Sequence, residues 1–355
     1  MDKQAPFEKI QVAVLGASGS VGQRFVQLLD QHPWFRITAL AGSGRSVGQV
    51  YEQACHWLLE QPMPDWAKEM VVQPVSPDGI QAQIVFSALP SELAQQVEPE
   101  FAKAGMAVCS NASAFRQEQD VPLLLPEVNP DHIELVQAQR QKRGWRGFII
   151  TNPNCTSTGL TIALKALQDA FGLQRVFAVS LQALSGAGFP GVASLDIIDN
   201  VLPYIEGEED KVEWEPRKML GNYEDGEVTM AGLRISAHTN RVAVSDGHLV
   251  CVSLELAQPA GLECATTVLR QFQPPPASQD LPSMPRPVIV VCDQPNRPQP
   301  RLDRLVGRGM STVVGRIRTD PLFHLKFVVL SHNTIRGAAG GSILNAELLV
   351  SEGLL

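Results

Sequence analysis

Short apolar runs recur through the first 150 residues of the chain. They occupy residues 9–15, 36–41, 83–89, 106–110 and 147–151, and stretches with helical spacing of apolar positions separate several of them. Continuous apolar runs of this length are typical of strands that are buried on both faces of a parallel sheet. The pattern therefore predicts an α/β domain with a Rossmann-like, doubly wound sheet.

The pattern changes after residue 155. A helix is predicted from Ser157 to Phe171, and strands are predicted at 174–184, 311–318 and 323–331. Residues 241–252 are predicted to form a strand, a turn at Asp246-Gly247 and a second strand. We expect these strands to form a mainly antiparallel sheet in an α+β domain.

Two domains account for the length of 355 residues. We expect residues 1–154 to form a nucleotide-binding domain and residues 155–332 to form a second, catalytic domain. A final helix over 333–355 is expected to pack back on the first domain.

Composition excludes several classes of protein. The net charge of −8 argues against nonspecific binding to nucleic acid. The chain lacks a run of about 20 apolar residues that would span a membrane, and its N-terminus lacks the apolar core of a signal peptide. None of the six cysteines lies in a C-x-x-C pair, so neither a metal site nor a disulfide framework is predicted. These features favour a cytoplasmic protein with reduced thiols.

A glycine-rich turn follows the first predicted strand. Its sequence, Gly16-Ala-Ser-Gly-Ser-Val-Gly22, stands between that strand and a helix. Glycines let a backbone approach a pyrophosphate, and the helix N-terminus favours its negative charge. The turn predicts a dinucleotide site, although its G-x-x-G-x-x-G spacing differs from the commoner G-x-G-x-x-G. The alternative is a glycine-rich turn without a ligand.

The end of the second predicted strand bears on the choice of cofactor. An NAD site usually carries Asp or Glu there for the ribose 2′-hydroxyl, whereas this chain has Ser43, Arg45 and Ser46. A guanidinium between two hydroxyls suits a 2′-phosphate, so the residues favour NADP. The alternative is a solvated surface loop.

The candidate nucleophile is Cys155. The Asn152-Pro-Asn-Cys155 sequence is expected to turn from a strand into a helix, which places the cysteine at the helix N-terminus. That position favours the thiolate, the nucleophilic form. Backbone N–H groups there, helped by the Asn154 side chain, are expected to hold an oxyanion. The alternative is a small, buried structural cysteine.

Other candidates follow predicted strands or turns. Ser87, Asn111 and Arg116 lie at or after strand ends, where parallel sheets bind ligands. Arg116 suits an anionic group of a substrate, and a surface salt bridge is the alternative. His248 follows an Asp-Gly turn and is either catalytic or structural.

These pieces together resemble aspartate-semialdehyde dehydrogenase along nearly the whole chain, and its archaeal and fungal branch in particular. Blocks in one order carry the resemblance: Gly16–Gly22, Arg45-Ser46, Ser110-Asn111, Pro126-Glu-Val-Asn129, Asn152-Pro-Asn-Cys-Thr156, Gln182-Ala-Leu-Ser-Gly-Ala-Gly188, Ile205–Lys211, Arg241-Val-Ala-Val-Ser-Asp-Gly-His248, and Asn333 with the glycine-alanine run after it. One departure is Ser113-Ala-Phe-Arg116, which is similar to the bacterial branch.

The resemblance implies NADP-dependent reduction of aspartyl phosphate to aspartate semialdehyde, with release of phosphate, in lysine, threonine and methionine synthesis. It implies that Cys155 is the nucleophile, beside Asn154, and that His248 is the acid/base. It also implies a dimer interface in the second domain, and hence a homodimer or a dimer of dimers.

The same resemblance implies the remaining site residues. Arg241 would bind the substrate α-carboxylate, Glu208 the α-amino group, and Lys211 and Arg116 the phosphate, with Gln182 as a further contact. Residues from the glycine-rich turn, the loop after the second strand and later strand ends would line the NADP site: Gly16, Ser18, Gly19, Ser20, Val21, Ser43, Arg45, Ser46, Ser87, Asn111, Ser185, Gly186 and Asn333.

Alternative functions remain open at this point. One alternative is a reductase of the same branch that acts on an acyl-CoA such as malonyl-CoA through the same thioester. Another is N-acetylglutamyl-phosphate reductase, which follows the same reaction scheme. From another class, the chain would be a thioester-forming hydrolase or an inactive binding module. The glycine-rich turn and Arg45 count against these last two.

Overall fold

The computed structural model describes residues 8–355, which divide into two compact units. The first unit consists of residues up to Pro122, Ile133–Asn152 and Ser342–Leu355, and the second of Leu123–His132 and Pro153–Gly341. Among the described residues, no helix is both long and apolar enough to cross a membrane.

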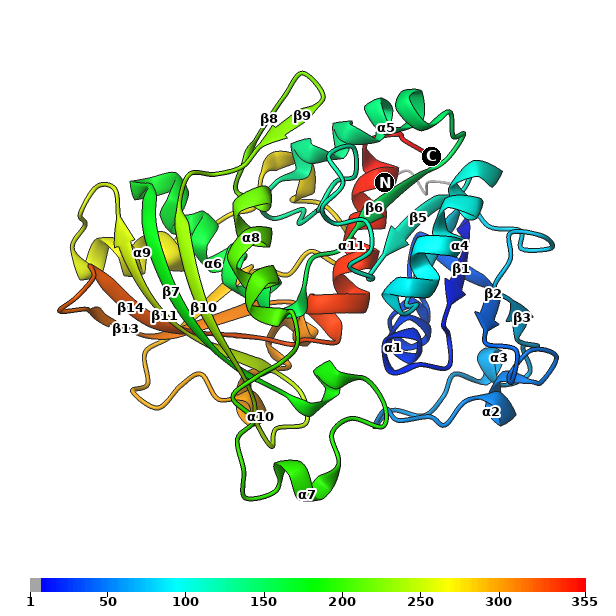
Figure 1. The fold of residues 1–355 in the computed structure, drawn as a ribbon, viewed down its shortest axis with the longest axis horizontal. Coiled ribbons are helices and arrows are strands. Elements are labelled where there is room, and N and C mark those ends of the chain that lie inside the picture. Colours follow the sequence, from blue (N-terminus) through cyan, green and yellow to red (C-terminus); the bar gives the residue numbers. More distant parts are fainter. Residues whose placement is uncertain (1–7) are drawn as a thin grey trace, which may run out of the picture. The chain divides into compact units, whose positions relative to one another are not determined.

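The first unit contains a six-stranded parallel sheet in the order β3-β2-β1-β4-β5-β6 (Figure 1). The strands are β1 Ile10–Leu15, β2 Phe35–Gly42, β3 Gln73–Pro74, β4 Ile84–Ser87, β5 Ala107–Ser110 and β6 Phe148–Thr151. The helices are α1 Ser20–Leu29, α2 Tyr51–Ala54, α3 Asp65–Lys68, α4 Ser91–Ala104, α5 Leu135–Arg143 and, at its C-terminal end, α11 Gly340–Ser351. The predicted Rossmann-like fold is confirmed.

Apolar residues cover both faces of this sheet. On one face Phe25 of α1 stacks on Phe86 of β4, with ring centroids 4.9 Å apart. Phe101 of α4 belongs to a buried cluster with Val85 and Val108 on the other face. Burial on both sides explains why these strands have continuous apolar sequences.

The second unit contains a mixed, mostly antiparallel six-stranded sheet in the order β10-β7-β11-β14-β13-β12. The strands are β7 Leu173–Gln182, β10 Arg234–Arg241, β11 His248–Leu256, β12 Ile289–Cys292, β13 Thr312–Thr319 and β14 Leu325–Ser331, with a separate hairpin of β8 Asn222–Glu224 and β9 Glu227–Thr229. The helices are α6 Cys155–Phe171, α7 Ser194–Ile197, α8 Glu208–Met219, α9 Leu262–Gln271 and α10 Pro300–Asp303, and a π-helical turn, η5, spans Ile335–Ala339.

Helices α6 and α9 pack on one face of this sheet (Figure 1). Residues of β11 alternate accordingly: Val250 and Val252 are buried, whereas Cys251 between them is exposed. Helix α8 packs against β10 and α6.

Some predicted bounds were wrong. The segment 241–252 was predicted as two strands on either side of an Asp246-Gly247 turn. The second strand, β11, does begin at His248, whereas the first strand, β10, ends at Arg241, where the prediction began it. The helix predicted from Ser157 begins at Cys155, since the Asn154 side chain caps it. The last predicted helix begins as the η5 π-helical turn before α11.

Strand direction gathers three predicted site residues at one edge of this sheet. Strands β7 and β10 are parallel, and Gln182 pairs with Arg241 at their ends. Strand β11 runs the other way, so it starts at that edge with His248, opposite Ser331 at the end of β14.

Candidate active site

Cys155 is the first residue of α6, as the turn sequence predicts. The preceding residue, Asn154, is the N-cap, and its Oδ1 accepts hydrogen bonds from the backbone N–H groups of Thr156 at 2.9 Å and Ser157 at 3.2 Å. The sulfur of Cys155 therefore lies at the positive end of a 17-residue helix, a position that favours a thiolate.

His248 lies beside this sulfur. Its Nε2 is 3.3 Å from Cys155 Sγ, and its Nδ1 accepts a hydrogen bond of 3.0 Å from the backbone N–H of Ala183. The ring is almost completely buried. Burial, the nearby Arg241 cation and His332 together lower the pKa of His248 to about 3, so the ring is neutral over the physiological range.

Arg241 and Gly186 complete the surroundings of the histidine. The buried Arg241 donates from Nη1 to the carbonyl oxygen of Ala183 at 2.8 Å. Burial lowers the pKa of its guanidinium, while Cys155 and Glu208 act in the opposite direction. A Cβ on Gly186 would lie 2.7 Å from Arg241 Nη1 and 3.1 Å from His248 Nε2, so a larger residue there would push against the guanidinium and the ring.

The other two predicted cofactor residues of the second unit are bonded to each other. Asn333 donates from Nδ2 to Ser185 Oγ at 2.8 Å and accepts from the Gly247 N–H at 2.9 Å. This contact ties the start of η5 to the turn before His248.

Glu208, the predicted ligand of the α-amino group, is the centre of a buried polar cluster. Its Oε1 accepts from Asn154 Nδ2 at 2.6 Å and from Gln182 Nε2 at 3.3 Å, and its Oε2 is 3.3 Å from Lys211 Nζ. The structure thus brings together Cys155 and all the predicted catalytic and substrate residues except Arg116, which lies in the first unit.

Sequence reasoning missed a second carboxylate on α8. Glu215 is fully buried, and its Oε2 accepts a hydrogen bond of 2.6 Å from the backbone N–H of Asn154. It stands seven residues after Glu208, and this spacing places both on one face of the helix. The spacing was the available signal for it.

Two further residues act through η5 and were also missed. A Cβ on Gly337 would lie 2.8 Å from the Cβ of Cys155, so this turn packs its backbone on the nucleophile. The neighbouring Arg336 makes a two-pronged ion pair with Glu127, and both side chains are fully buried. The pair anchors the turn, and π-helical turns are frequent at functional sites.

The glycine-rich turn of the first unit fits a dinucleotide phosphate. Gly16 has a left-handed φ of +72°, and a Cβ there would lie 2.7 Å from the Ala88 carbonyl oxygen. A Cβ on Gly22 would lie 2.2 Å from the Gly16 carbonyl oxygen, so the turn closes tightly on α1. In the described part of the chain no side chain caps α1 at Gly19, which leaves its first N–H groups to a ligand.

The loop after β2 has the residues that a 2′-phosphate requires. Arg45 is exposed between Ser43 and Ser46, and the hydroxyl of Ser46 donates to the Ser43 carbonyl oxygen at 2.9 Å. This hydrogen bond closes the turn that contains Arg45.

Strand ends of the first unit gather the remaining candidates. Asn111 donates from Nδ2 to the backbone carbonyl oxygen of Ser87 at 3.1 Å, and the backbone carbonyl oxygen of Asn111 accepts from Arg116 Nη2 at 2.8 Å. Beneath them, Ser110 Oγ donates to Glu98 at 2.7 Å. Burial raises the pKa of this carboxyl to about 7.

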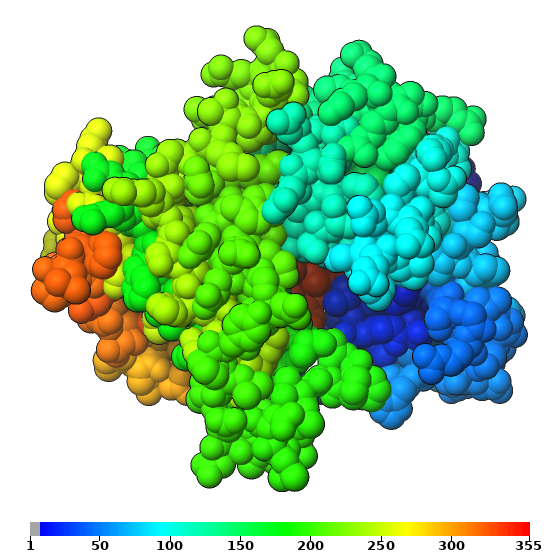
Figure 2. All heavy atoms as spheres, in the orientation of Figure 1, coloured from blue at the N-terminus to red at the C-terminus, as the bar shows by residue number. Residues whose placement is uncertain are grey.

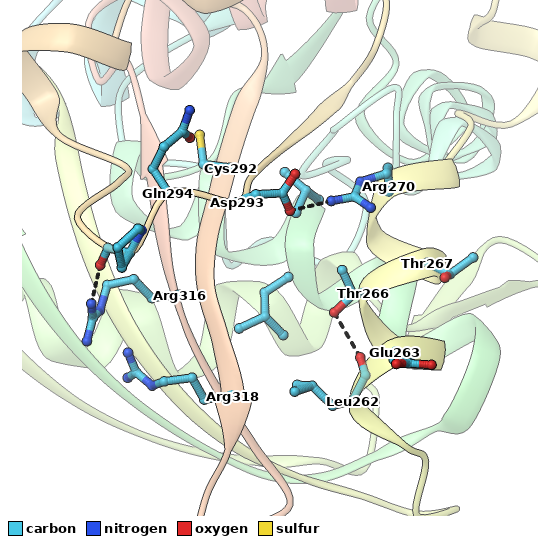
Figure 3. A pocket seen from close by; sticks show the side chains of 13 residues that line it. Leu262, Glu263, Thr266, Thr267, Arg270, Cys292, Asp293, Gln294, Arg316 and Arg318 are labelled. Atoms are coloured by element: carbon cyan, nitrogen blue, oxygen red, sulfur yellow. Dashed lines mark hydrogen bonds and ion pairs between the residues drawn. The ribbon is translucent and has the colours of Figure 1, made fainter.

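A pocket of about 580 Å³ lies elsewhere in the second unit, between α9, β12 and β13 (Figure 3). Figure 3 shows that Arg316 and Arg318 extend on one side of a strand, whereas Arg270 pairs with Asp293 on the other. The predicted site residues, all within the described part of the chain, do not line this pocket.

Comparison with protein families gives two matches. Residues 11–136 match the family described as semialdehyde dehydrogenase, NAD binding domain, and residues 164–336 match semialdehyde dehydrogenase, dimerisation domain.

Curated relatives and solved structures agree with these matches. The chain is 51% identical to aspartate-semialdehyde dehydrogenase from Archaeoglobus fulgidus over 98% of this chain and 100% of that protein, and 44% identical to the Saccharomyces cerevisiae enzyme over 96% and 98%. The structure of the Candida albicans enzyme with NADP has a TM-score of 0.90 at 44% identity, covering 98% of this chain and 100% of that one. Aspartate semialdehyde dehydrogenase II of Vibrio cholerae, complexed with ASA, has a TM-score of 0.77 at 26% identity, covering 97% and 99%.

The tight glycine turn, the Cys155–His248 pair and these full-length similarities lead to one conclusion: the chain belongs to the aspartate-semialdehyde dehydrogenase family.

Proposed function

We propose that the protein catalyses the NADP-dependent reductive dephosphorylation of aspartyl phosphate to aspartate semialdehyde. The observation that carries this proposal is the 3.3 Å approach of His248 Nε2 to Cys155 Sγ at the start of α6, next to the cluster around Glu208. A thiolate in this position is suited to attack an activated acyl group.

The chain's own residues supply binding and covalent chemistry. Arg241 binds the substrate α-carboxylate, Glu208 and Gln182 bind the amino-acid end, and Lys211 binds the phosphate with Arg116. The sulfur of Cys155 forms a bond to the acyl carbon, the bond from carbon to the phosphate oxygen breaks, and the phosphate leaves with that electron pair. The product of this step is a thioester on Cys155.

The cofactor site is proposed in the first unit. The N–H groups at the start of α1 would hold the pyrophosphate, and Arg45 would hold the 2′-phosphate of NADP. When bound, NADPH supplies the hydride that reduces the thioester. The carbon–sulfur bond then breaks, the aldehyde leaves, and Cys155 returns to its thiolate form.

We assign these roles to the two units as predicted. Residues 1–154, with the helix of 333–355, would bind the cofactor, and residues 155–332 would carry catalysis and dimerisation.

The match to a dimerisation domain supports a homodimer or a dimer of dimers. The segment around α7 also exposes Leu195, Ile198 and Tyr204 on a lobe that protrudes from its unit (Figure 2). Light scattering after size exclusion would contradict this assembly if the protein ran as a monomer at micromolar concentration.

A biosynthetic role on phosphorylated metabolites supports a cytoplasmic location. Fractionation of the producing cells with activity measured in each fraction tests this, and activity confined to an exported fraction would contradict it.

The function is tested by NADPH absorbance in twin assays. One contains aspartate semialdehyde, phosphate and NADP, and the other contains malonate semialdehyde, coenzyme A and NADP. We expect phosphate-dependent NADPH formation in the first. Signal in the second alone would make the protein an acyl-CoA reductase, which its relatives' names do not favour.

A further inference from the structure

Two buried side chains hold the carbonyl oxygens of the glycine-rich turn. Tyr51, the first residue of α2, donates from its hydroxyl to the Ala17 carbonyl oxygen at 2.7 Å. Gln23 of α1 donates from Nε2 to the Ser18 carbonyl oxygen at 3.0 Å. The turn therefore directs these two oxygens toward the protein and away from a ligand.

The orientation of one peptide group depends on the Tyr51 contact. In a trans peptide the C=O of one residue and the N–H of the next point in opposite directions. The hydroxyl that holds the Ala17 carbonyl oxygen therefore turns the Ser18 N–H away from Tyr51. Within residues 8–355, nothing accepts a hydrogen bond from the N–H groups of Ser18, Ser20 and Val21, so these are the donors available to a phosphate.

We propose that Tyr51, together with Gln23, is a positioning residue for the cofactor. Its hydroxyl holds the peptide between Ala17 and Ser18 so that the Ser18 N–H faces the pyrophosphate and the Ala17 oxygen does not. Without these contacts the carbonyl oxygens would be free to turn toward the phosphate, where negative charges repel each other. This inference rests on the proposed function, in which the turn binds the pyrophosphate of NADP.

Tyr51 is a fixed donor in this contact. A carbonyl oxygen only accepts, so the phenol proton lies between the Tyr51 and Ala17 oxygens. Burial, with Cys55 nearby, raises the pKa of Tyr51 far above its ordinary value, so the phenol keeps its proton across the physiological range. The backbone N–H of Tyr51 donates to the Met70 carbonyl oxygen at 2.8 Å, which holds the start of α2 in place.

The chain segment that contains Tyr51 links the turn to the loop of Arg45. Tyr51 follows that loop directly, at the start of α2. Gln23 bonds the same segment, because its Nε2 also donates to the His56 carbonyl oxygen at 2.9 Å and its Oε1 accepts from the Leu58 N–H at 2.7 Å. The segment thus supports the pyrophosphate turn, whereas the loop before it carries the residue proposed for the 2′-phosphate. Ligands that contain only one of these phosphate groups can separate the two roles.

Tyr51→Phe tests the hydroxyl alone, because phenylalanine keeps the buried ring. In calorimetry on the full-length protein we expect NADP to bind about 3- to 10-fold more weakly, the range that one hydrogen bond contributes. NAD should lose affinity by the same factor, since both cofactors carry the pyrophosphate. Binding of 2′-AMP, which has the 2′-phosphate but no pyrophosphate, should be unchanged. Initial rates at saturating NADP should show an unchanged kcat and an unchanged KM for aspartate semialdehyde.

Thr38→Val is the matched control. The Thr38 hydroxyl, in the middle of β2, donates to the Gln81 carbonyl oxygen at 2.9 Å, so valine also removes one hydroxyl-to-carbonyl hydrogen bond from the same unit. We expect both of its cofactor affinities to equal those of the wild type. Titrations below the melting transition of each variant compare folded proteins only.

Gln23→Met is a second variant, which removes the amide hydrogen bonds at a similar side-chain length. It should weaken NADP and NAD by equal factors and leave 2′-AMP unaffected, and it decides the proposal if Tyr51→Phe does not fold. Unchanged affinity for both cofactors in the folded variant would overturn the proposal. A loss for NADP alone would show action through the Arg45 loop, and an equal loss in Thr38→Val would show a general effect of stability; either result would also overturn it.

The wild-type protein separates this result from failure of the proposed function. Wild-type protein that binds neither cofactor would refute the proposed cofactor site. Wild-type protein that binds NADP but forms no NADPH from aspartate semialdehyde and phosphate would refute the reaction and leave this inference intact. Equal NADP binding by the wild type and Tyr51→Phe would refute only the role of Tyr51.

Discussion

Helices α1 and α6 both begin directly after a turn that follows a parallel strand, and their N-termini are built in opposite ways. The turn before α1 consists of small residues, and its N-cap, Gly19, offers no capping side chain among the described residues. In the turn before α6, by contrast, the polar groups of Asn154 already have hydrogen-bond partners. Its side chain caps the helix and donates to Glu208, and its backbone N–H donates to Glu215.

The difference matches two kinds of chemistry. A helix start that leaves its N–H groups without partners suits a ligand that arrives and departs with its own negative charge. A helix start whose groups are already bonded holds one residue in a fixed place. Cys155 benefits from the electrostatic field of α6, while the rigid network around Asn154 sets the position of its sulfur.

The largest effect is expected from replacing the nucleophile at the N-terminus of α6. Cys155→Ser should reduce turnover by at least about 10³-fold, because a serine hydroxyl is a far weaker nucleophile than a thiolate. NADP should still raise the melting temperature, since the cofactor residues are unchanged. Initial rates and thermal melts measure both. Retained turnover would sink the assignment of Cys155.

The next largest effect is expected from adding a methyl group inside the glycine-rich turn before α1. In Gly22→Ala the new Cβ would lie 2.2 Å from the Gly16 carbonyl oxygen, so the turn must move. We expect NADP affinity to fall by at least about 100-fold, equivalent to about 2.7 kcal/mol, as measured by calorimetry. Gly232→Ala is the matched control, because among described atoms none lies within 4 Å of its added methyl. Unchanged affinity in Gly22→Ala would argue that the turn holds no phosphate.

A further effect is expected from Arg45, which lies in the loop after β2 of the first unit. Its loss should raise the KM for NADP by roughly 10- to 100-fold, since a hydrogen bond to a charged group contributes about 1.5–3 kcal/mol. The KM for NAD, which lacks the 2′-phosphate, should change little. Arg36→Ala, another exposed arginine of the same unit, serves as the control. An equal rise for both cofactors would mean that Arg45 does not bind the 2′-phosphate.

The sequence predicted that a helix follows each of the two turns, because each turn depends on local residue types. Glycines at 16 and 22 and the Asn-Pro-Asn-Cys sequence each favour a tight backbone turn through their residue types alone. The fold of the first unit was predictable for a similar reason, since strands buried on two faces have continuous apolar runs.

The partners of Asn154, Cys155 and His248 were not predictable in this way. Glu215, Gly337 and the Ala183 N–H come from segments distant in sequence, and tertiary packing alone brings them to the site. Strand β10 was also missed, because Arg234–Arg241 is polar at alternate positions and only part of it is buried.

A smaller effect removes the cap of α6. Asn154→Ala leaves the N–H groups of Thr156 and Ser157 without their acceptor, and it should lower the free energy of unfolding by about 1 kcal/mol. Asn154→Ser retains a capping oxygen but not the amide that donates to Glu208. Denaturant titration should therefore rank Ser above Ala, and equal stability would contradict the capping role.

The smallest effect is expected from giving α1 the kind of cap that α6 has. Gly19 has an extended backbone with φ of −74°, which serine accepts, and its new Cβ would lie 3.3 Å from the Gly16 carbonyl oxygen. In Gly19→Ser the hydroxyl can accept from the first N–H groups of the helix and should raise the free energy of unfolding by a few tenths of a kcal/mol. Those same N–H groups are then occupied, so NADP should bind more weakly although the apoprotein is more stable. Denaturant titration and calorimetry on one preparation test the two signs together. A variant that is more stable and binds NADP as tightly as before would show that the open start of α1 is not what the cofactor uses.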